Sequence, residues 1–214
     1  MKLEDQAEIV SLMQAARDKA RGYADFFGWA IDRDLEEWGV VVALAESMHA
    51  DGTLFFSKIK SRRRPNDPPD CEALGESGQR LAIEVTELVD GPMIHEYKRA
   101  RKERKLSEWA EWNQQKFIDA LTCCITKKDR HFPALKDPPY SDGYMVVIHT
   151  DEPGLPRNVV EKFLDGHVFQ KPEYIDRALL LLSYDPSIER CPYFELKWMA
   201  NEALQPTAPM RRSG

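Results

Sequence analysis

The stretch from Arg80 to Val89 alternates clearly between apolar and polar residues, which is the pattern of a β-strand with one covered face. The apolar positions belong against a helix and the polar positions face the other way: Leu81, Ile83, Val85 and Val89 on one side, and Arg80, Glu84 and Thr86 on the other. Glu84 therefore falls in the middle of the strand. A carboxylate at such a place is costly unless it is paired, hydrogen-bonded or bound to a metal ion.

Around this strand, segments with helical spacing alternate with segments typical of strands. This order predicts an α/β protein with a mixed sheet flanked by helices. We expect helices over 4–27, from Asp32 or Asp34 to about Met48, from about Ser107 to Asp129, and over 158–164; we expect strands over 53–60, 70–74, 80–89, 144–150, 178–184 and 193–198. The prediction is a single domain over 1–204, with a helical extension over 1–30 and a flexible tail over 205–214.

Composition excludes some classes of protein. Hydrophobic residues make up 43% of the 214 residues, so the chain can bury a core, and the formal charge of −6 excludes a uniformly basic nucleic-acid coat protein. The longest apolar run, Val40 to Ala45, is too short to span a membrane, and no secretory signal is visible. The four cysteines form no C-x-x-C pair. We therefore expect a cytoplasmic protein with no membrane partner.

Two acidic residues are predicted to meet across a hairpin. Gly75-Glu76-Ser77-Gly78 is a plausible turn between the strand that begins at Asp70 and the strand that contains Glu84. Folding there would bring the two carboxylates to opposite or diagonal positions. Two carboxylates and a backbone carbonyl are hard oxygen ligands, which suit Mg²⁺ or Mn²⁺. Glu84 pairing with Arg80 or Lys58 across the sheet is the alternative without a metal.

A third carboxylate, Glu37, can join them from the preceding helix. It lies on the apolar stripe that continues through Val41, Leu44 and Met48, so it would point along the buried face beside the sheet. Glu36 is the competing residue.

These residues resemble the core of the PD-(D/E)XK, or restriction-endonuclease-like, nuclease superfamily. The resemblance rests on Glu37, Pro69-Asp70 and Ile83-Glu84-Val85-Thr86, and by order and spacing it covers roughly residues 34–150. Within the superfamily the chain is similar to an uncharacterised bacterial branch. The resemblance implies a core that runs helix, three-stranded meander, helix, strand. It also implies Mg²⁺-dependent hydrolysis of DNA phosphodiester bonds, with Asp70 and Glu84 as metal ligands and Glu37 as an auxiliary ligand.

The chain departs from the superfamily at one catalytic position. The superfamily has lysine two residues after the acidic strand residue, and this chain has Thr86, which supplies no cation to a phosphoryl group. Lys128 is our candidate replacement, because it continues the helical stripe of Phe117, Leu121 and Cys124 toward the sheet. The alternative interpretation is that Lys128 only complements the helix dipole at the C-terminal end of its helix.

Two basic clusters flank the acidic residues in the sequence and can meet phosphates. The first is Lys58, Lys60, Arg62, Arg63 and Arg64; the second is Lys98, Arg99, Arg101, Lys102, Arg104 and Lys105. Both can instead be solvated faces. The expected partner is DNA, with RNA as an alternative, and a homodimer would suit cleavage of two strands.

Two rivals to a DNA nuclease stay open. The first is a catalytically inactive module that keeps the nuclease fold and binds nucleic acid or a protein partner. The second is a different metal phosphoesterase that acts on nucleotides or RNA.

Overall fold

The computed structural model describes residues 32–103, 105 and 109–199, together with residues 11, 23, 24, 26 and 27. The tail over 205–214 and most of the predicted helical extension lie outside these residues. The elements are α2 (Arg33–Ala50), β1 (Ser57–Ser61), β2 (Cys71–Leu74), β3 (Arg80–Glu87), α3 (Gly91–Lys102), α4 (Gln114–Asp129), a 3₁₀ turn (Phe132–Ala134), β4 (Tyr144–Thr150), α5 (Arg157–Leu164), β5 (Arg177–Leu182) and β6 (Tyr193–Glu195). None of the described helices has the length and apolar character that a membrane crossing needs.

The strands form one mixed sheet in the order β1-β2-β3-β4-β5-β6. The first three strands are an antiparallel meander, β3, β4 and β5 run parallel to one another, and β6 returns antiparallel to β5. The predicted α/β class with a mixed sheet is therefore confirmed.

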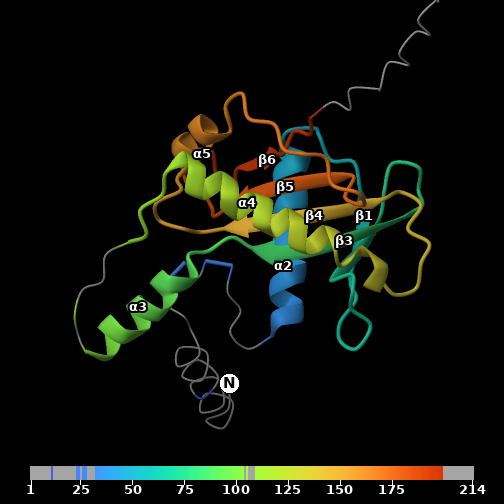
Figure 1. Cartoon of the computed structure of the whole chain (residues 1–214). Coiled ribbons are helices and arrows are strands. Elements are labelled where there is room, and N and C mark those ends of the chain that lie inside the picture. Colours follow the sequence, from blue (N-terminus) through green and yellow to red (C-terminus); the bar gives the residue numbers. More distant parts are fainter. Residues whose placement is uncertain are drawn as a thin grey trace, which may run out of the picture.

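Helices cover both faces of this sheet. Figure 1 shows α2 crossing behind the strands and α4 crossing in front of them. Because β4 lies between the two helical layers, all seven of its residues are buried. The α2 side packs Val40, Val41, Leu44 and Met48 against Leu81, Ile83 and Val85, and the α4 side packs Phe117, Leu121 and Ile125 against Ala82, Val146 and Ile148.

The structure adds a helix, α3, where the sequence indicated only a charged stretch. Asp90 caps α3 by accepting a hydrogen bond from the Met93 amide at 3.0 Å, and a proline stands in the first turn. None of the helix residues is buried, so no apolar stripe marks it in the sequence. The next helix, α4, begins at Gln114 and not near Ser107, because the Asn113 side chain caps it.

The hairpin of β2 and β3 sets the geometry of the candidate site. Cys71 pairs with Ile83, so the residue just before β2, Asp70, reaches the level of Glu84. Since β2 begins only at Cys71, the second half of β3 pairs with β4 on one side alone. The other side of β3 is left as an open edge, and Asp70 occupies it.

Candidate functional site

Asp70 is fixed at the open edge of β3 by two backbone hydrogen bonds. The Val85 amide donates to Asp70 Oδ2 at 2.7 Å, and the Arg62 amide donates to the Asp70 carbonyl at 2.9 Å. The residue is 8% exposed. The carboxylate therefore replaces the missing strand partner of β3 and keeps one orientation.

Glu84 lies on the α4 face of β3 and is 2% exposed. Its Oε2 accepts a hydrogen bond from the Lys128 ammonium, whereas its Oε1 is buried and has no hydrogen-bond partner among the described residues. Burial and the neighbouring Asp70 carboxylate raise the pKa of Glu84, and Lys128 opposes them. An acceptor without a partner at this depth is costly, so it marks a place where a cation would be stabilised.

Lys128 projects from the last turn of α4 onto both carboxylates. Its Nζ contacts Glu84 Oε2 and lies 3.4 Å from Asp70 Oδ2, and its side chain is 12% exposed. The Tyr144 hydroxyl donates to the Lys128 carbonyl at 2.9 Å, which fixes this end of the helix. The structure thus brings Asp70, Glu84 and Lys128 together. The pairing of Glu84 with Arg80 or Lys58 does not form, because Arg80 pairs with Glu72 at 2.8 Å.

Glu37 approaches the same centre from α2. It is buried, and the Arg33 Nε donates to its Oε1 at 2.6 Å. Burial, followed by repulsion from Asp70, raises the pKa of Glu37 from 4.5 to about 7. Glu36 is only half-buried, so the structure separates these two neighbours and places Glu37 nearer the acidic pair.

A cleft of about 390 Å³ opens over these residues. Its lining combines acidic and basic side chains from α2, β3, α4, the turn after α4 and the end of β4: Arg33, Glu36, Glu37, Val85, Thr86, Glu87, Lys127, Lys128, His131 and His149. Asp70 and Glu84 do not line the cleft themselves, but Lys128, which contacts both carboxylates, does.

Several cleft residues were missed in the sequence analysis. Arg33 stands four residues before Glu37 on the same helix, which is the spacing of a helical ion pair, so its contact with Glu37 could have been anticipated. His149 is paired in register with Glu87 of β3, a relation that needs the strand order. His131 lies in the turn after α4, and no local pattern indicates where that turn leads.

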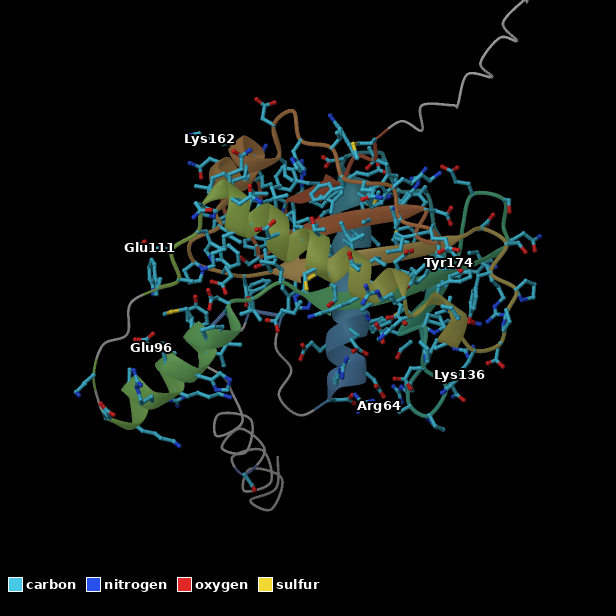
Figure 2. All side chains as sticks on the ribbon, viewed as in Figure 1. Arg64, Glu96, Glu111, Lys136, Lys162 and Tyr174 are labelled. Carbon is cyan, nitrogen blue, oxygen red and sulfur yellow. The ribbon has the colours of Figure 1, made fainter. Side chains whose placement is uncertain are left out.

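The first basic cluster is divided by the fold. Lys58 and Lys60 are exposed on β1, and Arg63 and Arg64 are exposed in the following loop, where Arg64 lies 3.7 Å from Asp34. Figure 2 shows Arg64 beside the first turns of α2. The Arg62 side chain, by contrast, is 12% exposed and is held by the side chains of Glu72 and Asp137 and by the Asn66 carbonyl.

The donor set fits a hard divalent cation, although a complete ligand set is not assembled. Across residues 32–103 and 109–199, no three His, Cys, Asp or Glu side chains are already grouped around one point as metal ligands. Two carboxylates do converge on one cationic group, the Lys128 ammonium, and one of their oxygens has no partner. Carboxylate oxygens are the ligands that Mg²⁺ and Mn²⁺ prefer.

Comparison with known proteins adds no relative: no protein-family model matches the chain, and searches of curated proteins and of solved structures find no match.

Proposed function

We propose that the protein is a divalent-metal-dependent nuclease of the restriction-endonuclease-like type, which hydrolyses phosphodiester bonds in DNA. The observation that carries this proposal is the pair of buried carboxylates, Asp70 and Glu84, at an open sheet edge, which share the ammonium group of the cleft residue Lys128. The order of α2, the β1–β3 meander, α4 and β4 supports the proposal, since it is the core that the sequence resemblance implies, with α3 inserted before α4.

Burial of two acids side by side argues for more than a structural role. Removing charges from water costs several kcal/mol for each ion, and apolar residues of similar size often stabilise a core as well as an ion pair does. Lys128 and Arg33 supply two positive charges beside three acids, Asp70, Glu84 and Glu37. With all three acids ionised the site holds one negative charge in excess, which a divalent cation would offset.

Asp70 and Glu84 would hold Mg²⁺ or Mn²⁺, with Glu37 as the auxiliary ligand. When bound, the ion would supply charge to a phosphoryl oxygen and make hydroxide available near neutral pH. Lys128, from α4, brings to Asp70 and Glu84 the amine that the motif lysine would supply and that Thr86 lacks. There it would stabilise the negative charge that develops on the phosphate.

One observation favours the second candidate, an inactive nuclease-fold module that binds nucleic acid or a protein partner. Lys128 already neutralises part of the acidic pair without any metal, and Thr86 stands where the motif lysine is expected. Such a module would keep the cleft and lose hydrolysis.

Cleavage assays test the proposal. The purified chain would be incubated with plasmid DNA, single-stranded DNA and RNA, in Mg²⁺, in Mn²⁺ or in a chelator. We expect metal-dependent cleavage that falls about 100-fold or more in Asp70→Asn and Glu84→Gln, because each substitution removes a charged ligand oxygen. Glu161→Gln, on the exposed surface of α5, is the matched control and should keep full activity. The proposal would be contradicted if the chain cleaved DNA with neither Mg²⁺ nor Mn²⁺. It would also be contradicted if both site variants cleaved DNA as the unmodified chain does.

A further inference from the structure

Helix α3 concentrates positive charge on an otherwise acidic protein. Residues 91–105 contain six basic and two acidic side chains, whereas the whole chain has a formal charge of −6. In Figure 1 the helix projects away from the sheet, beyond the end of β3. This distribution points to a polyanionic partner that meets the protein at α3 and not over its whole surface.

The cations of α3 are exposed and mostly free of ion pairs within the described part of the chain. Arg99 lies 4.0 Å from Glu96, and Lys105 lies 2.8 Å from Glu103. Lys98, Arg101 and Lys102 are exposed and make no ion pair with any described residue. Within the part of the chain that the structure describes, three cations are therefore available to a ligand.

The N-terminal end of α3 lies close in sequence to the candidate site, and contacts of its cap residue hold it in place. The helix begins four residues after Glu87, which lines the cleft. Its cap residue Asp90 pairs with Lys116 at 2.6 Å, and the Asp90 amide donates to buried Glu152 at 2.6 Å. Glu152 also accepts hydrogen bonds from Tyr23 and Trp112. These contacts fix the first turn of α3 next to the end of β3.

The apolar side of α3 is already in use, which argues against a membrane surface as the partner. Helices that lie on membranes insert a free apolar face between lipids. Met93, Ile94, Tyr97 and Ala100 are half-buried, and the ring of Tyr97 lies 5.8 Å from the ring of Tyr23. The charged side of α3 is the more exposed one, which suits the phosphates of a nucleic acid.

We infer that α3 is the main nucleic-acid-binding element of the protein, and that it holds the phosphate backbone of DNA beside the cleft. The inference rests on the proposed nuclease function and names the surface that this function needs. The 12-residue helix is about 18 Å long, and duplex DNA carries one negative charge per about 1.7 Å, so several phosphates fit along it. The first basic cluster is the weaker candidate, because Arg62 is held within the protein and Arg64 lies near Asp34.

The test compares two variants that remove the same charge. The α3 variant is Lys98→Gln/Arg101→Gln/Lys102→Gln. The matched control is Lys162→Gln/Lys171→Gln/Lys197→Gln, which removes three exposed lysines from α5, the segment before β5 and the segment after β6. Binding to a labelled DNA duplex is measured by fluorescence anisotropy in chelator over a series of salt concentrations. Circular dichroism and thermal melting check that both variants fold as the unmodified chain does.

We expect the α3 variant to bind at least about tenfold more weakly, with the slope of log affinity against log salt reduced by about one for each cation removed. The control should bind as the unmodified chain does. Equal binding by the two variants would overturn the inference and leave the nuclease proposal standing. No binding of DNA by the unmodified chain would overturn both. Sedimentation with vesicles of anionic lipid is measured in parallel: if the α3 variant lost vesicle binding and kept DNA binding, the inference would be overturned and α3 assigned to a membrane surface.

Discussion

At the scale of single residues, Lys128 is the group that compensates the charge of the buried acids Asp70 and Glu84. Its ammonium contacts Glu84 Oε2 and lies 3.4 Å from Asp70 Oδ2, so one cation serves two buried acids. Mutational studies of buried ion pairs show that loss of one partner is strongly destabilising, because the remaining charge has no compensation. The metal-free protein therefore depends on Lys128, and a bound divalent cation would take over its role.

Replacing Lys128 by methionine tests this dependence. We expect Lys128→Met to lower the free energy of unfolding of the metal-free chain by about 3–5 kcal/mol. Mn²⁺ should then raise the thermal midpoint of the variant more than it raises that of the unmodified chain. Differential scanning calorimetry with and without Mn²⁺ measures both effects. Lys127→Met is the control, since Lys127 is exposed at the cleft. Equal stability of Lys128→Met and the unmodified chain would contradict the assignment.

Glu37 should make the stability of the metal-free protein depend on pH. Because its pKa is raised from 4.5 to about 7, the folded protein binds a proton that the unfolded chain releases between these values. The contribution to stability is complete below about pH 4.5 and is lost as the pH rises to about 7; it amounts to at most about 3 kcal/mol. Urea titrations from pH 4.5 to 8 should show this decline, and Glu37→Gln should flatten it. An unchanged pH dependence in Glu37→Gln would show that Glu37 does not titrate in this range.

At the scale of elements, the sequence predicted those that carry a clear pattern. The stripe of α2 and the two candidate caps, Asp32 and Asp34, placed that helix to within a few residues, and the structure has Asp32 as the cap. The alternation of β3 and the continuous apolar run of β4 identified both strands. The turn at residues 75–78 then predicted that Asp70 would lie opposite Glu84, which the register of the hairpin places there.

Elements whose position depends on tertiary contacts were predicted less well. β1 begins at Ser57 and not at Thr53, because its limits are set by pairing with the short β2 across an irregular register. α3 has no buried residue, so it has no apolar periodicity by which to recognise it. The cleft lining brings together α2, β3, α4 and β4, and the inclusion of Arg33, His131 and His149 follows from that packing and not from any local motif.

At the scale of the whole molecule, the site forms where the two helical layers meet the open edge of the sheet. α2 brings Glu37 from one face, α4 brings Lys128 from the other, and the hairpin places Asp70 between them beside Glu84. The three acids come from separate segments of the chain, so their meeting depends on the complete sheet. Positive charge is gathered on α3, which projects away from the sheet beyond the end of β3, while the chain as a whole is acidic.

Direct measurement of Mn²⁺ binding to the purified chain tests the central claim, that Asp70 and Glu84 share a divalent cation. Isothermal titration calorimetry should show a Mn²⁺ site in the unmodified chain that is lost in Asp70→Asn and in Glu84→Gln, while Glu161→Gln binds Mn²⁺ normally. The same titration would contradict the claim if the unmodified chain bound no Mn²⁺, or if both site variants bound it with unchanged affinity.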